Sequence, residues 1–114
     1  MVMTISDLVK AGIAQARLGY YRDAVDQFSQ AIQLDRKCTK AFYNRGCSYR
    51  DLGKHQAALD DFSTAIRLDP VFVNAYINRG NIHRDMGNLA AALADFDRAL
   101  SIQPTAIKGF SNRG

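Results

Sequence analysis

Cysteine and proline are scarce in this chain, which has two of each in 114 residues. The two cysteines, Cys38 and Cys47, form no C-x-x-C pair, and no cluster of histidine and cysteine has the spacing of metal ligands. The sequence therefore predicts no metal site, and free thiols of this kind are typical of a reducing compartment. So few prolines also exclude a disordered, proline-rich chain.

Long apolar runs are missing too. The longest uncharged stretches are far too short to cross a bilayer, and Asp7 and Lys10 interrupt the start of the chain. We therefore expect neither a membrane span nor a secretory signal, and the expected location is the cytoplasm. The net charge of +4 slightly favours acidic partners, but it does not by itself indicate nucleic-acid binding.

What the chain does have is a repeat of 34 residues. The tripeptide Asn-Arg-Gly occurs at 44–46, 78–80 and 112–114, and residues 39–72 align with residues 73–106 without a gap and with 14 identities. Residues 5–38 align with residues 39–72 with 11 identities. We therefore divide the single domain, residues 1–114, into units at about 5–38, 39–72 and 73–106, with a partial unit at 107–114.

Each unit has apolar residues at helical spacing, and no strand pattern competes with it. A glycine that follows an apolar residue closes the first helix of each unit, at Gly19, Gly53 and Gly87. Pro70 and Pro104 end the second helix, because the residue before proline is pushed out of the helical region. The expected helices span about 5–18, 22–35, 40–52, 56–69, 74–86 and 90–102, with a seventh from 108 onward. Thr4 with Asp7 is typical of a capping box for the first of them.

A second set of glycines falls inside the first helix of every unit, at positions 12, 46, 80 and 114. A glycine within a helix costs about 0.5–1 kcal/mol relative to alanine. A position that accepts this cost in every unit should have a packing reason. We expect its partner to be a small residue of the second helix, which is Ala24, Ala58 or Ala92.

The complete pattern is a large residue four positions before glycine, then Ala-x-x-x-Phe-x-x-Ala, then proline. In the second unit these are Phe42, Gly46, Ala58, Phe62, Ala65 and Pro70. The pattern resembles the tetratricopeptide repeat (TPR), and the resemblance covers essentially the whole chain. Departures from it are Arg36 at the proline position, and Gln15 and His83 where the family usually has tyrosine.

The resemblance implies an all-α fold, a right-handed α-solenoid of antiparallel helix pairs whose first helices line a concave groove. It also implies an interaction scaffold and no enzyme, with no cofactor, that binds an extended peptide or a partner helix of another protein. The alternative is a structural segment of a larger protein or assembly, which mediates oligomerisation or positions an attached domain.

The same resemblance implies which side chains face the groove. We expect Lys40, Tyr43, Asn44 and Arg50 from the second unit, Asn74, Ile77, Asn78, Asn81 and Arg84 from the third, and Asn112 from the partial fourth. The first unit would present Ser6, Val9, Lys10, Ile13, Ala16 and Arg17, a face that is more apolar than the other two.

Three of these residues, Asn44, Asn78 and Asn112, form a ladder with one asparagine per unit. An amide both donates and accepts hydrogen bonds, as a peptide backbone requires. A similar ladder is known in the repeat superhelix of the O-linked N-acetylglucosamine transferase. The alternative is that these amides bond only within their own helices or to water.

Charged pairs stand near the end of two first helices, Arg50 with Asp51 and Arg84 with Asp85. The arginines would either select acidic side chains on a ligand or be neutralised by their neighbours, and we favour neutralisation. Carboxylates in the same groove also disfavour RNA binding.

A known TPR variant binds the acidic tails of heat-shock chaperones with a carboxylate clamp. Of its five positions only Asn44 matches here, and when the comparison is shifted by one unit only Asn78 and Lys108 match, so that ligand is disfavoured.

Arg45 and Arg79 occupy a site where the family usually has leucine, and their units carry Asp61 and Asp95 just before the core phenylalanine. In the first unit both members are replaced, by Ala11 and Gln27. This joint replacement predicts a structural Arg–Asp contact between paired helices.

The partial fourth unit would lean on the third through Ile107 and Phe110 and would leave part of its own apolar surface uncovered. We expect either that the sequence is a piece of a longer array, which we favour, or that the uncapped C-terminal end mediates self-association.

Overall fold

The computed structural model describes residues 2–104 and contains six α-helices and no strand within that range. The helices are α1 (Ile5–Arg17), α2 (Tyr21–Leu34), α3 (Thr39–Asp51), α4 (His55–Leu68), α5 (Val73–Asp85) and α6 (Leu89–Ile102). Each predicted boundary lies within one residue of the observed one, whereas the seventh predicted helix falls outside the described residues. No helix in the described part has both the length and the apolar character needed to cross a membrane.

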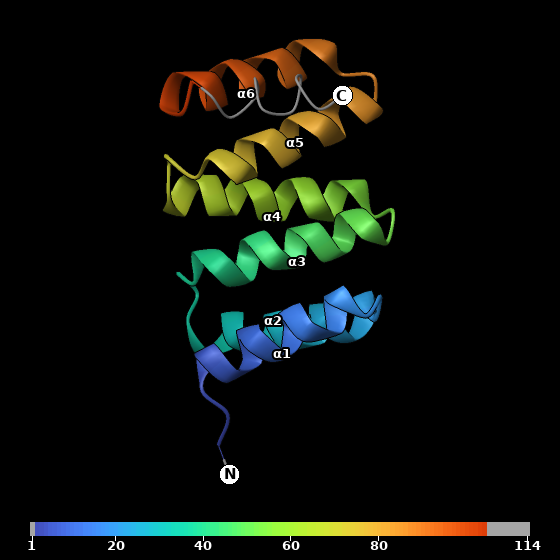
Figure 1. Ribbon diagram of the computed structural model, residues 1–114, viewed down its shortest axis with the longest axis vertical. Coiled ribbons are helices and arrows are strands. Elements are labelled where there is room, and N and C mark those ends of the chain that lie inside the picture. Colours follow the sequence, from blue (N-terminus) through green and yellow to red (C-terminus); the bar gives the residue numbers. More distant parts are fainter. Residues whose placement is uncertain (1, 105–114) are drawn as a thin grey trace.

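The helices form a stack of three pairs along the 45 Å long axis of the molecule (Figure 1). Each first helix packs on the second helix of its own unit, and α2 and α4 also pack on the first helix of the next unit. The first helices contact one another as well, α1 with α3 and α3 with α5. The predicted all-α solenoid is thus confirmed, and one side of it is built from first helices alone.

The helix ends follow the local sequence signals. Gly19, Gly53 and Gly87 have φ angles of 85°, 76° and 82°, a conformation that favours glycine over residues with a side chain. At the start of α1 the Thr4 hydroxyl accepts a hydrogen bond from the Asp7 backbone N–H (3.1 Å), and the Asp7 carboxylate accepts one from the Thr4 N–H (3.0 Å). The predicted capping box is therefore present.

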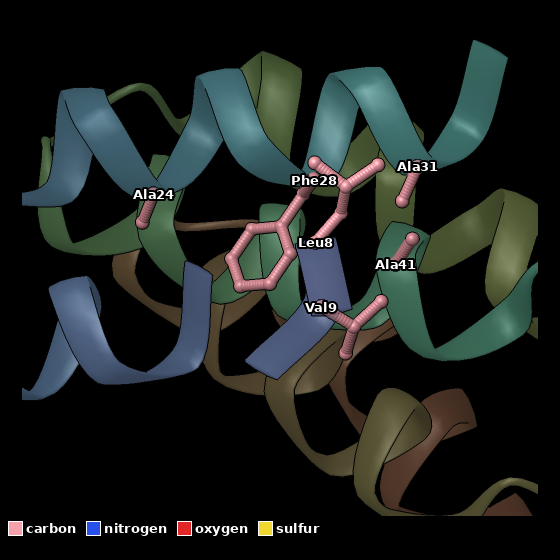
Figure 2. Packing of buried hydrophobic residues seen from close by; sticks show 6 residues of the cluster. All are labelled: Leu8, Val9, Ala24, Phe28, Ala31 and Ala41. Carbon is pink, nitrogen blue, oxygen red and sulfur yellow. The ribbon is translucent and has the colours of Figure 1, made fainter. Parts of the chain in front are cut away.

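The core is continuous from one unit to the next. In the first cluster Phe28 of α2 lies among Leu8 and Val9 of α1, Ala24 and Ala31 of α2, and Ala41 of α3 (Figure 2). In the second cluster Phe62 and Leu59 of α4 pack with Ile82 of α5. Each second helix therefore buries its apolar residues both within its own unit and against the following one.

The glycines inside the first helices do have a packing reason, but the predicted partner is wrong. A Cβ atom at Gly46 would lie 2.9 Å from Cε1 of Phe62, and one at Gly12 would lie 2.5 Å from Cε1 of Phe28. Gly80 faces Phe96 in the same way, with a separation of 2.8 Å. The glycine therefore makes room for the phenylalanine ring, and the nearest atoms belong to that ring and not to the alanine one turn before it.

Candidate functional site

The side of the stack built from first helices carries a hydrogen-bonded group that joins α3 to α5. The amide nitrogen Nδ2 of Asn78 donates to the Tyr43 hydroxyl (3.0 Å), and Nη1 of Arg50 donates to Oδ1 of Asn78. These three residues, which we call the inner-face triad, lie on neighbouring units although 28 and 35 residues separate Asn78 from its partners. The structure thus brings together three of the residues predicted to share the groove.

Packing fixes the tyrosine of this triad. The Tyr43 ring is stacked on Phe72 with centroids 4.7 Å apart, and it is tilted against Phe62 at 5.7 Å. Burial raises the pKa of Tyr43 above its usual value. The nearby Cys47 is half-buried, and burial raises the pKa of its thiol. At neutral pH both groups therefore stay protonated, and Cys47 lacks the thiolate character of a reactive cysteine.

The two described asparagines of the ladder differ in their partners. Both donate to the backbone carbonyl four residues earlier, Asn44 to Lys40 (2.8 Å) and Asn78 to Asn74 (2.9 Å). Asn78 has the two triad partners in addition, whereas this helical bond is the one hydrogen bond of the Asn44 side chain within residues 2–104. Asn112 lies outside the described residues.

The arginines at the end of α3 and α5 contact the carboxylates beside them. The shortest contact is 3.2 Å between Nε of Arg50 and Oδ1 of Asp51, and 3.7 Å between Nε of Arg84 and Oδ1 of Asp85. The Arg84–Asp85 pair is more than half exposed, so water screens it. This geometry agrees with mutual neutralisation, the interpretation favoured from the sequence.

The remaining predicted groove residues differ in accessibility. Ile77 is buried in the third core cluster with 7% of its surface exposed, so it offers a ligand little contact area. The half-buried residues are Tyr43, Asn44, Arg50, Asn78 and Asn81, and the exposed ones are Lys40, Asn74 and Arg84. In the first unit Ile13 and Ala16 are half-buried and pack against the first core cluster.

The predicted Arg–Asp contact is confirmed in both units that carry it. Arg45 donates from Nε and Nη2 to the two carboxylate oxygens of Asp61, each at 2.8 Å. Arg79 binds Asp95 in the same bidentate way, at 2.9 and 2.7 Å. Burial raises the pKa of the Asp61 carboxyl above its usual value, although Arg45 acts in the opposite direction.

A second hydrogen-bond partner of each of these arginines was not predicted. Nη1 of Arg45 donates to the Ser29 hydroxyl of α2 (3.2 Å), and Nη1 of Arg79 donates to Ser63 of α4 (3.1 Å). Each guanidinium therefore joins three helices across a unit boundary. The sequence signal was present, because Ser29 and Ser63 are equivalent positions 34 residues apart.

Two adjoining surface hollows lie away from the inner face, near the turns after α1 and α3. They share Arg22 and Leu52, and the larger one also includes Val25 and Tyr49. Asp26 and Lys54 place one negative and one positive charge among its lining residues, so the larger hollow does not favour a ligand of either charge. Within the described residues no three histidine, cysteine or carboxylate side chains are placed to hold one metal ion.

Comparison with known families decides the identity of the repeat. A sequence model described as tetratricopeptide repeat matches residues 43–107, which is more than half of the chain. The chain belongs to the tetratricopeptide repeat family. A comparison with curated proteins found no match to this TPR sequence.

Solved structures share the TPR fold over nearly all of the chain. MamA is 28% identical with a TM-score of 0.87, over 91% of this chain and 61% of MamA, so this chain spans less than two thirds of that protein. The second TPR domain of Spaghetti (RPAP3), bound to the HSP90 peptide SRMEEVD, is 25% identical with a TM-score of 0.85, over 89% of this chain and 94% of that domain. The Yersinia enterocolitica secretion chaperone SycD, in complex with a peptide of the translocator YopD, has a TM-score of 0.88 at 21% identity, over 96% of this chain and 85% of SycD.

Proposed function

We propose that this TPR protein is an interaction scaffold that binds an extended peptide, or a helix of a partner protein, along the inner face of its first helices. The observation that carries the proposal is the polar row on that face, where Asn44 and Asn78 occupy equivalent positions of neighbouring units next to Tyr43 and Arg50. Asparagine suits a peptide backbone because its amide both donates and accepts.

The ligand-contacting residues that we propose are Lys40, Tyr43, Asn44, Arg50, Asn74, Ile77, Asn78, Asn81, Arg84 and Asn112. Two of the similar structures support a peptide as the ligand, since Spaghetti was solved with an HSP90 peptide and SycD with a YopD peptide. Because this chain lacks most of the carboxylate-clamp residues, the acidic chaperone tail is not the ligand we propose.

The test is capture of partners by the intact protein and by the variant with both Asn44→Ala and Asn78→Ala. We expect the double variant to stay folded and to lose the partners that the intact protein retains. A partner that is retained equally by both proteins would contradict binding through Asn44 and Asn78. A matched control is Gln30→Ala, which changes an exposed amide on the second helix α2.

A second candidate function, a structural part of a larger assembly, is favoured by one observation on α6. Leu93 is 63% exposed, whereas Leu59, at the equivalent position of the second unit, is 8% exposed because it packs with Ile82 of α5. An apolar residue at this position is suited to contact a further element.

Self-association would be one form of this second function. Sedimentation at increasing protein concentration tests it. We expect the average molecular mass of the intact protein to increase with concentration, and that of Leu93→Gln to stay at the value of a monomer. A monomer at every concentration would contradict self-association.

A further inference from the structure

We propose that the ligand is held mainly in the upstream half of the groove, between α1 and α3, and that the segment bound there is an extended peptide with an apolar side chain next to a carboxylate. This inference rests on the proposed function and specifies its site and its ligand. Asn44 and Asn78 are equivalent in the repeat but differ in their hydrogen-bond partners.

Asn78 is already engaged within the protein. Both of its N–H groups have acceptors, the Asn74 carbonyl and the Tyr43 hydroxyl, and its oxygen accepts from Arg50. A peptide that used this amide would first have to break the inner-face triad, and each broken bond would subtract from the binding free energy. Asn78 therefore acts as a link between units two and three.

The side-chain amide of Asn44 is available to a ligand because the first unit has no polar side chains at the positions equivalent to Tyr43 and Arg50. The residues 34 positions before Tyr43 and Arg50 are Val9 and Ala16, neither of which can hydrogen-bond an amide through its side chain. Within the described residues one N–H of Asn44 is bonded to Lys40, while its second N–H and its oxygen have no protein partner. These two groups match the carbonyl and the N–H of one residue in an extended chain.

The surroundings of Asn44 define the character of the bound side chains. Ile13 and Ala16, which are half-buried, supply the accessible part of an apolar floor, and Val9 belongs to the core cluster against which they pack. Cys47 adds a half-buried thiol with a raised pKa, which is uncharged at neutral pH. No charged residue stands among these four. A ligand side chain that contacts this floor must therefore be apolar.

The charges at the edge of this half are positive and unpaired. Three cations, Lys10, Arg17 and Lys40, are exposed and form no salt bridge within the described residues. Lys10 slightly lowers the pKa of Asp7 through its positive charge, without a salt bridge between them. In the downstream half the arginines Arg50 and Arg84 are paired with carboxylates. Complementarity therefore favours a carboxylate on the ligand near α1 and the start of α3.

The experiment measures the affinity of three short, fluorescein-labelled peptides by fluorescence anisotropy. One alternates leucine with glutamate, one leucine with lysine, and one serine with glutamate, and a single-stranded oligouridylate is included as a nucleic-acid probe. We expect the leucine–glutamate peptide to bind about tenfold more tightly than each of the other probes.

Two pairs of variants then locate the site, with the urea unfolding midpoint measured in parallel. Asn44→Ala and Lys40→Glu should each weaken the leucine–glutamate peptide about tenfold and leave the unfolding midpoint unchanged. Asn78→Ala should lower the unfolding midpoint and, at temperatures where it is folded, change the affinity less than about threefold. Arg84→Glu changes a residue of the downstream half, where we expect only minor ligand contacts, so it should weaken the affinity less than about threefold and leave the unfolding midpoint nearly unchanged.

The outcomes separate the two proposals. A larger loss of affinity in Asn78→Ala and Arg84→Glu than in Asn44→Ala and Lys40→Glu would overturn the upstream site and leave groove binding intact. Peptide binding that none of the four variants affects would overturn the proposed function itself. Equal affinity for the serine–glutamate peptide, tighter binding of oligouridylate, or no binding of any probe would overturn the ligand class.

Discussion

Arg45 and Asp61 meet through two parallel hydrogen bonds of 2.8 Å, and the same arrangement recurs 34 residues later between Arg79 and Asp95. Side-chain exposure is only 20% for Arg45 and 6% for Asp61, so both charges are largely removed from water. A buried pair of this kind costs desolvation energy, and its net stabilisation is small, but the loss of one partner leaves an uncompensated charge.

We therefore expect Asp61→Ala to lower the free energy of unfolding by about 2–3 kcal/mol, measured by urea denaturation. The control is the adjacent Asp60→Ala, which changes an exposed carboxylate and should cost less than about 0.5 kcal/mol. The double variant Arg45→Met, Asp61→Leu should regain most of the loss, because both charges are then removed. Additive costs of Arg45→Met and Asp61→Leu would mean that the two residues are not coupled.

The contact between Gly46 and the Phe62 ring predicts an unusual response to alanine. An added methyl group would lie 2.9 Å from the ring, inside the normal contact distance. Gly46→Ala should therefore destabilise the protein by about 1–2 kcal/mol, although alanine is the better helix former. Phe62→Leu should partly relieve the cost in the double variant. If Gly46→Ala instead stabilised the protein, as expected for an exposed helical glycine, the close packing would be disproved.

Ser48 and Ser29 should respond oppositely to the same substitution. The Ser48 hydroxyl is buried and has no hydrogen-bond partner among the described residues, so Ser48→Ala should stabilise the protein by about 1 kcal/mol. The Ser29 hydroxyl accepts from Arg45, so Ser29→Ala should destabilise it by about 1 kcal/mol. Thermal unfolding followed by circular dichroism measures both. The same sign for both variants would contradict the hydrogen-bond assignment.

The capping box gives a pH dependence with a defined sign. The hydrogen bond that the Thr4 backbone N–H donates to the Asp7 carboxylate, with a smaller contribution from the Thr4 side chain, lowers the pKa of Asp7 below its usual value. Since the folded-state pKa is below the unfolded one, the contribution of Asp7 is complete above about pH 4 and is lost as the pH falls through the folded-state pKa.

The difference in urea midpoint between the intact protein and Asp7→Ala should therefore be largest at neutral pH and shrink as the pH falls below about 4, the ordinary pKa of an aspartate. Asp23→Ala is the control, because Asp23 also lies in the first turn of a helix but without a side-chain capping bond. A difference for Asp7→Ala that is the same at both pH values would contradict the role of the ionised carboxylate.

Most of the fold could be predicted because its signals are local and repeated. The glycines after each first helix, the prolines after two second helices and the apolar spacing all act within a few residues, so the predicted boundaries are accurate to one residue. The Arg45–Asp61 contact was predictable for a different reason: its two members are absent together from the first unit.

What the sequence did not predict depends on side-chain direction between elements. Spacing alone showed that Gly46 needs a small side chain, but not whether Ala58 or the Phe62 ring fills the space. Likewise, Asn44 and Asn78 are equivalent in the repeat, but Asn78 bonds to Tyr43 of the preceding unit, whereas the position equivalent to Tyr43 in the first unit is Val9, which cannot hydrogen-bond through its side chain.

The most direct test of the account is the side-chain amide resonance of Asn44, observed by NMR in the 15N-labelled protein during titration with the leucine–glutamate peptide. We expect the Asn44 side-chain resonances and the backbone resonances of α1 and the first turns of α3 to shift together, while those of α2 and α4 stay nearly constant. Shifts confined to the second helices, with Asn44 unchanged, would contradict ligand binding on the inner face.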